Sequence, residues 1–119
     1  MRRVMIFLTG ALIFFLSGCS NYEIPAPPCP EGSTGMSFSQ DIQPIFTNNC
    51  LACHSGSQSP DLSPGWSYEE LTEGGFVDTE FPCSSRIYQA FSLSVHDGKL
   101  TEEEQLKILG WIQEGAREN

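Results

Sequence analysis

The sequence is poor in positive charge: it has 6 lysines and arginines against 15 aspartates and glutamates, a formal net charge of −9. Nucleic-acid binding needs basic surface that neutralises phosphates, so this balance excludes nucleic acid as an expected partner. The charge also opposes adhesion to anionic lipid by charge alone. A basic protein partner fits it, because complementary charge steers encounter. The plainer alternative is that the charge only keeps the protein soluble.

The sequence also lacks an apolar run long enough to span a bilayer. Its most apolar stretch, Val4 to Leu16, has about 13 residues, whereas a spanning helix needs about 20. Arg2 and Arg3 precede this stretch, and a positive start followed by a short apolar run is the layout of a secretory signal. The sequence therefore predicts export rather than a membrane span.

Histidine is scarce, with 2 in the chain, and one completes the stretch Cys50-Leu51-Ala52-Cys53-His54. This is the C-x-x-C-H pattern of c-type haem attachment. Each thiol can form a thioether to one haem vinyl group, and the histidine then lies where its ring nitrogen can bind iron. One covalent haem would bring a redox-active metal and a large apolar area to a small chain.

Other chemistry can use two cysteines at this spacing. A zinc site normally needs a second ligand pair at similar spacing, and the sequence has no second C-x-x-C and no H-x-x-x-H. A zinc site would have to be assembled irregularly from Cys50, Cys53, Cys83 and His96. A redox dithiol should follow a strand in a βαβ setting, and no such setting is found.

The apolar run ends in Leu16-Ser17-Gly18-Cys19, which resembles the lipobox of bacterial lipoproteins. The resemblance implies a signal peptide over residues 1–18 and lipidation of Cys19 as the first mature residue. It places the protein in the bacterial cell envelope, anchored to a membrane through lipid and facing the periplasm. Ser20 favours the outer membrane over the inner. Cleavage before Cys19 leaves four cations against fifteen carboxylates, a formal charge of −11.

Two cysteines remain, Cys29 and Cys83. An even pair in an oxidising compartment permits a disulfide, and two free thiols are the alternative. Residues 19–36 are rich in proline, which disfavours a regular helix or a central strand, so we expect an extended tether there.

The folded domain is expected over residues 37–119. Asp41 can cap a first helix that runs to the haem motif, with Pro44 in its first turn. A capping box starting at Ser67 predicts a short helix over 68–72, and Ser84 or Ser85 can cap a helix over 86–91. A second capping box, Thr101 to Glu104, predicts a helix over 102–114, in which Gly110 would allow close approach of another helix. No strand pattern is found.

This order resembles the small monohaem cytochrome c domain, over about residues 37–119. The likeness rests on the helix that ends in the C-x-x-C-H motif, a Pro/Gly loop at Ser59–Gly65, and the C-terminal helix ending in Gly110-Trp111-Ile112-Gln113-Glu114-Gly115-Ala116. It implies an all-α fold of about four short helices around one covalent haem c. The implied function is one-electron transfer between redox protein partners, not enzyme catalysis, with His54 as the proximal iron ligand. In that family the terminal helices cross closely, which would give Phe46 and Gly110 a packing role.

The sequence departs from this family at the second iron ligand. The family commonly uses a methionine downstream of the motif, and no methionine follows His54 here. His96 lies in the expected loop and is the tentative distal ligand; an open or water-bound site, or Met36, are the alternatives. An open site would favour a gas or peroxide sensor or a peroxidase. A zinc- or disulfide-stapled structural lipoprotein without haem is the remaining alternative.

Six aromatic residues can wall the haem pocket or form the ordinary core. They are Trp66, Phe76, Phe81, Tyr88, Phe91 and Trp111.

Overall fold

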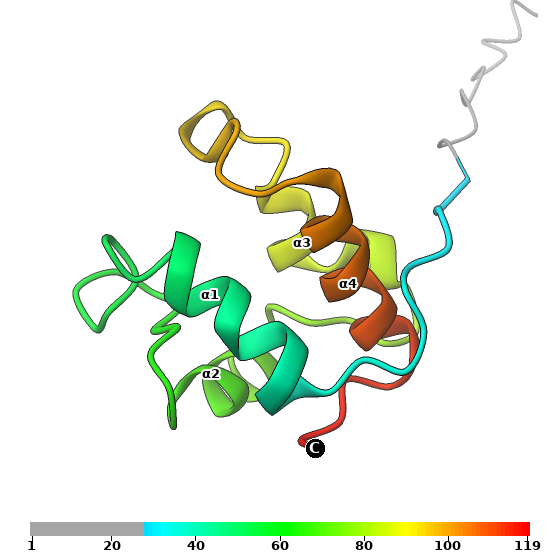
Figure 1. Ribbon diagram of the computed structural model, residues 1–119, viewed down its shortest axis with the longest axis horizontal. Helices are drawn as coiled ribbons and strands as arrows, with labels where there is room; N and C mark the ends of the chain where they lie inside the picture. Colours follow the sequence, from blue (N-terminus) through cyan, green and yellow to red (C-terminus); the bar gives the residue numbers. More distant parts are fainter. Residues whose placement is uncertain (1–27) are drawn as a thin grey trace, which may run out of the picture.

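The computed structural model describes residues 28–119, and this part of the chain is helical without strands (Figure 1). This confirms the all-α class. The signal peptide expected over 1–18, Cys19 and the tether up to residue 27 lie outside the described residues. Within residues 28–119, no helix is long and apolar enough to cross a membrane. The helices are α1 (Gln43–Asn49), α2 (Ser67–Glu73), α3 (Arg86–Ala90) and α4 (Glu102–Gln113), and the short turns are η1 (Phe38–Ile42), η2 (Pro82–Ser84) and η3 (Ser94–His96).

The first helix begins earlier than the sequence predicted, with Ser37 and not Asp41 as its N-cap. The Gln40 amide donates to Ser37 Oγ at 3.3 Å, and the Ser37 amide donates to Asp41 Oδ2 at 2.9 Å. One wide π-helical turn, η1, separates this cap from α1. The prediction was wrong because the Asp41 carboxylate folds back onto the Ser37 amide instead of capping the turn that follows it.

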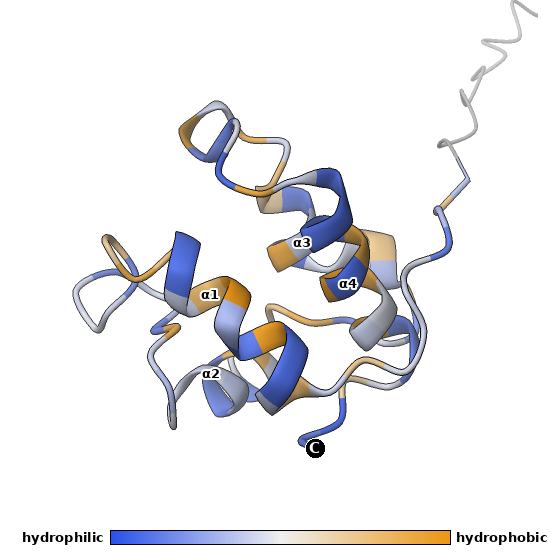
Figure 2. Cartoon of the chain, viewed as in Figure 1, coloured by the Kyte–Doolittle hydropathy of each residue, from blue (hydrophilic) through white to orange (hydrophobic). Residues whose placement is uncertain are grey.

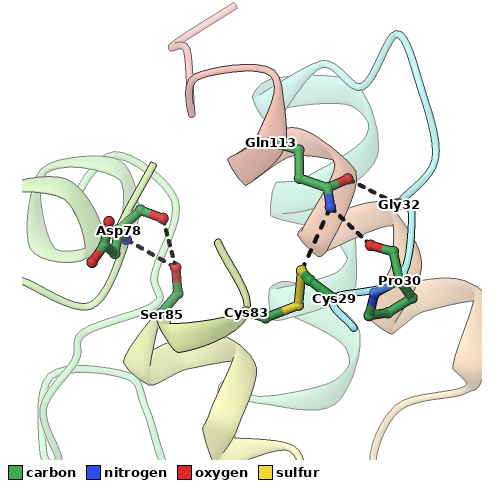
Figure 3. The surroundings of a disulfide bond; sticks show 7 residues. All are labelled: Cys29, Pro30, Gly32, Asp78, Cys83, Ser85 and Gln113. Atoms are coloured by element: carbon green, nitrogen blue, oxygen red, sulfur yellow. Dashed lines mark hydrogen bonds between the residues drawn. A yellow bond between two sulfur atoms is a disulfide. The ribbon is translucent and has the colours of Figure 1, made fainter. Parts of the chain in front are cut away.

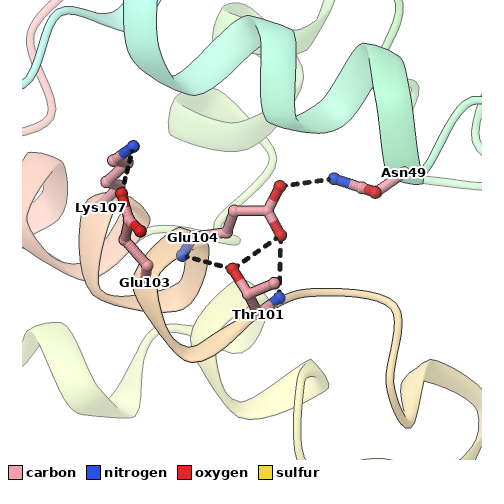
Figure 4. Close-up of polar contacts among 5 residues, drawn as sticks. All are labelled: Asn49, Thr101, Glu103, Glu104 and Lys107. Atoms are coloured by element: carbon pink, nitrogen blue, oxygen red, sulfur yellow. Dashed lines mark hydrogen bonds and ion pairs between the residues drawn. The ribbon is translucent and has the colours of Figure 1, made fainter.

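The capping box of α4 is confirmed. The Glu104 amide donates to Thr101 Oγ1 at 3.2 Å, and the Thr101 amide donates to Glu104 Oε2 at 2.8 Å (Figure 4). The backbone amides of Thr101 and Glu104 both find partners within the same four residues, so the sequence around Thr101 was enough to predict where α4 begins.

The capping bonds expected of Ser67 and Ser85 are absent, although α2 and α3 both form close to their predicted positions. Both serines are fully buried, so their hydroxyls bond to other elements. Ser67 donates to Gln43 Oε1 of α1. Ser85 donates to the Asp78 carbonyl at 3.2 Å and accepts from the Asp78 amide at 2.9 Å (Figure 3). The two hydroxyl groups therefore link separate segments of the chain and do not cap the helix N-termini.

Residues 29–36, here called the strap, run along α4 and do not form a free tether. The Ser33 amide donates to the Leu106 carbonyl at 2.9 Å, and the Gly32 amide donates to Gln113 Oε1 at 2.8 Å. Cys29 and Cys83 form a disulfide with their Cα atoms 5.7 Å apart, which ties the start of the strap to η2 (Figure 3). The folded domain therefore begins near Cys29 rather than at residue 37.

Gly110 allows a close approach, but its neighbour is the strap and not a second helix. A Cβ atom built on Gly110 would collide with the backbone of Ser33, and one on Gly32 would collide with Gly110. The expected packing of Gly110 against the first helix is wrong, because the extended strap occupies that face of α4. Phe46 of α1 is nonetheless fully buried in the core.

The core is formed by buried residues of η1, α1, α2, α3 and α4. Figure 2 shows hydrophobic residues along α1, α3 and α4. Trp111 packs against Phe38, with ring centroids 5.1 Å apart, and against Tyr68, with ring centroids 6.4 Å apart. The six aromatic residues thus divide between roles: Trp111 is core, whereas Trp66 and Phe81 are 63% and 59% exposed. This core leaves a separate, partly open space beside the C-x-x-C-H motif.

Candidate functional site

A cavity of about 470 Å³ lies between the end of α1, the loop after it, α3 and the segment that carries His96. Its volume is within the range of small-molecule and cofactor sites. Cys50, Cys53, His54 and His96 all contribute to its lining. A second cavity of about 580 Å³, beside Tyr68 and the C-terminal residue, contains no cysteine or histidine in its lining. The residues singled out in the sequence therefore meet at the first cavity.

The C-x-x-C-H motif occupies the tight turn that ends α1. The Cys50 amide closes the last turn on the Phe46 carbonyl at 2.9 Å, and the His54 amide donates to the Cys50 carbonyl at 3.0 Å. This turn places Cys50, which is partly buried, and Cys53, which is exposed, on the lining of one cavity. Both thiols are free in the structure.

His54 is held in a defined orientation and tautomer. Its Nδ1–H donates to the carbonyl oxygen of Pro60 at 3.1 Å, and its own carbonyl accepts from the Leu62 amide at 2.8 Å. With Nδ1 protonated, Nε2 carries the lone pair that can bind a metal. Metal-binding histidines usually have their second nitrogen fixed in this way, so His54 has the setting of a ligand.

His96 has the same kind of support on the opposite part of the lining. It ends η3, and its Nδ1–H donates to the Ala90 carbonyl at 2.8 Å. Neither His96 nor His54 has a hydrogen-bond partner at Nε2 among residues 28–119. Both histidines therefore line the same cavity, and each has a ring nitrogen without a hydrogen-bond partner among the described residues.

The two imidazoles are separated by a distance that suits one metal ion between them. Their ring centroids lie 6.2 Å apart, with 34° between the ring planes. A metal–imidazole bond is about 2 Å long and the ring centre lies about 1 Å further, so the centres of two imidazoles that bind one metal ion lie within about 6 Å of each other. Residues 54 and 96, which are distant in the sequence, are thus brought to a separation at which both rings could reach one metal ion.

The Cys50 thiol is held in its protonated form. Burial, with a further effect from the nearby Glu104 carboxylate, raises the pKa of Cys50 to about 11. Glu104 itself is fixed by hydrogen bonds from Asn49 and Thr101 (Figure 4). A raised pKa is the opposite of what an attacking dithiol needs, so this environment does not favour redox-dithiol chemistry.

The irregular zinc grouping does not assemble in the structure. Cys83 is bonded to Cys29, which removes its sulfur as a zinc ligand. Over residues 28–119, no group of three or more histidine, cysteine, aspartate or glutamate side chains has an arrangement that could hold a metal ion. Met36 lies against the hydrophobic core and does not line the cavity.

Two of the six aromatic residues, Phe76 and Phe91, line the cavity together with aliphatic side chains. The expectation that all six can wall the site was too broad, since Trp66 and Phe81 are exposed to solvent and Trp111 belongs to the core. The aliphatic part of the lining is Ala52, Leu62, Ile87, Ala90, Leu93, Val95 and Leu100.

Sequence reasoning missed three contributors to this site. Pro60 supplies the carbonyl that orients His54, and Arg86 and Lys99 line the cavity. Pro60 lies in the Pro/Gly loop that directly follows the C-x-x-C-H motif, so its position in the sequence already indicated that it could lie near His54. No sequence pattern indicated the two cations, because they come from separate elements. Comparisons of the chain with protein families, with characterised proteins and with solved structures found no match.

Proposed function

We propose that this protein is a one-electron-transfer protein that carries one covalent haem c in the cavity beside α1. Cys50 and Cys53 would hold the porphyrin through thioethers, and His54 and His96 would bind its iron. The observation that carries this proposal is the 6.2 Å separation of two imidazoles that are each anchored through Nδ1.

The donor set fits haem better than it fits a bare metal ion. A porphyrin provides the equatorial ligands, so the protein needs to supply only the axial ones, and two histidines suffice. A bare zinc ion needs four ligands, and the described residues do not provide such a group. The cavity volume and its apolar lining support the same assignment.

When bound, the haem would supply a centre that takes up and releases one electron. The chain's own residues do the rest. The Pro60 and Ala90 carbonyls fix the imidazole tautomers, and the apolar lining limits the access of water to the site. Two histidine ligands leave no position for a substrate, which favours electron transfer over gas sensing or peroxidase chemistry. They also favour a lower reduction potential than His/Met ligation.

The proposal includes the location and partners expected from the sequence. The protein would be anchored to an envelope membrane through Cys19 and face the periplasm, and it would exchange electrons with other proteins. A partner with a basic surface suits the charge of −11 that remains after cleavage. These assignments rest on the lipobox-like segment and the composition.

Absorption spectra test the function directly, on protein produced in a cell that attaches haem c. We expect a Soret band that survives denaturation and a low-spin spectrum in both redox states. The absence of a Soret band, with zinc in the purified protein, would instead support the structural alternative. A high-spin spectrum with ready carbon monoxide binding would support the open-site alternative.

The variant His96→Ala tests the second ligand. We expect it to keep the covalent haem but to become high-spin and bind carbon monoxide, because the trans imidazole is removed. Val95→Ala is a matched control, since Val95 lines the same cavity next to His96 and is 71% exposed. A low-spin spectrum that is unchanged in His96→Ala would remove His96 as a ligand.

A further inference from the structure

The positive charges of this acidic protein are concentrated at the cavity. The described part of the chain has four lysines and arginines, and two of them, Arg86 and Lys99, line the cavity. Within residues 28–119, neither forms an ion pair; the ion pair present there joins Lys107 to Glu103 at 2.9 Å. Two cations thus remain uncompensated at one site of a chain that is rich in carboxylates.

Negative charge is missing from the same lining. None of the residues that line the cavity is an aspartate or glutamate, although the chain contains 15 of them. The other ionisable groups of the lining are the two histidines and the two free cysteines. The Glu104 carboxylate lies close to Cys50 at one part of the lining, so the positive region is the part of the cavity to which Arg86 and Lys99 contribute, and that part can attract an anion.

The two cations come from elements that also hold the candidate iron ligands and the cavity wall. Arg86 begins α3, and its guanidinium lies 4.4 Å from the ring centroid of Phe76, another lining residue. This cation–π contact keeps the guanidinium at the cavity. Lys99 follows η3 closely, and its amide donates to the His96 carbonyl at 3.1 Å. Both cations are therefore positioned by the fold that forms the site.

We propose that Arg86 and Lys99 form a carboxylate-binding side of the cavity and pair with the propionates of the haem. This inference rests on the proposed function. A guanidinium binds a carboxylate through two parallel N–H bonds, whereas the Lys99 ammonium acts as a mobile point charge. The pair fixes which edge of the porphyrin lies toward α3 and the loop after η3. It also attracts an anionic cofactor to a chain whose overall charge repels it.

The test compares haem-loaded wild type with Arg86→Gln, Lys99→Gln, Arg86→Lys and Lys107→Gln. Resonance Raman spectra report the bending modes of the propionates, whose frequency falls when their hydrogen bonds are lost. We expect a downward shift in Arg86→Gln and in Lys99→Gln. Arg86→Lys keeps the charge and should restore most of the wild-type frequency. Lys107→Gln removes a cation that is paired elsewhere on α4 and should change nothing.

The outcomes separate this inference from the proposed function. A wild-type protein without covalent haem would overturn both. Haem-loaded Arg86→Gln and Lys99→Gln proteins with unchanged propionate modes would overturn the carboxylate-binding role alone, and leave electron transfer standing. Because Arg86 and Lys99 are both exposed at the rim of the cavity and lie outside the buried core, folding of the variants can be checked by their unchanged far-ultraviolet spectra.

Discussion

Replacing Gly110 by alanine should destabilise the whole protein and yet stabilise a version that lacks the strap. In the full domain the new Cβ would collide with the Ser33 backbone, so the strap must move away from α4. The Ser33–Leu106 and Gly32–Gln113 hydrogen bonds would then be lost or weakened, at about 1 kcal/mol each. Overpacking adds a cost of about 1–3 kcal/mol, and the better helix propensity of alanine returns about 1 kcal/mol. We expect a net loss of about 2–4 kcal/mol.

The sign should reverse in a chain that begins at Met36 and carries Cys83→Ser. Without the strap, nothing crowds position 110 from that side, so only the helix-propensity gain of about 1 kcal/mol should remain. Urea unfolding followed by far-ultraviolet circular dichroism measures both values, with the full and shortened chains in the same state of haem loading. The exposed substitution Glu103→Ala is the control, because its effect should be equal in both chains.

One result would refute this reasoning. If Gly110→Ala destabilises the full and the shortened chain by the same amount, the residue packs against another element, as the sequence alone had led us to expect. Stabilisation of both chains would instead mean that the strap does not contact α4 in solution. Only opposite signs agree with the structure.

Two further predictions concern the helix that follows the site and the motif thiol. Thr101→Ala should lower the free energy of unfolding by about 1 kcal/mol, measured by urea titration, because it removes the capping bond to the Glu104 amide; Thr101→Ser should retain most of it. In the haem-free chain, stability should fall as pH rises from about 9 to 11, because the folded state holds the pKa of Cys50 at about 11, above its ordinary value of 9.0. This contribution is complete below pH 9 and is lost as pH passes through 11. Thermal unfolding across this range should show the loss, and Cys50→Ala should abolish it; an identical alkaline loss in that variant would contradict the assignment to Cys50.

Features that depend on neighbouring residues could be read from the sequence. The C-x-x-C-H turn and the Thr101 capping box involve atoms only a few residues apart, so their residue types and spacing were sufficient. The helix α4 was located for the same reason. The helices α2 and α3 form close to their predicted positions, although the serine caps on which the prediction depended do not form. The capping bonds predicted for Ser67 and Ser85 were wrong, because both serines are buried and their hydroxyls bond to Gln43 and Asp78.

Features that depend on distant residues were decided only by the tertiary structure. The sequence left the second ligand open among His96, Met36 and an open site, and only folding brings the His54 and His96 rings to 6.2 Å. The packing of the strap on α4 could not be predicted, because residues 29–36 show no hydrophobic periodicity that would indicate packing. The strap fits against α4 because Gly110 has no side chain. The C-x-x-C-H motif by itself favoured haem but left zinc and dithiol chemistry open; the residues that would attach the haem and bind its iron are neighbours in the sequence. What faces that motif across the cavity is a property of the fold, because it is assembled from α3, η3 and the loop that joins them.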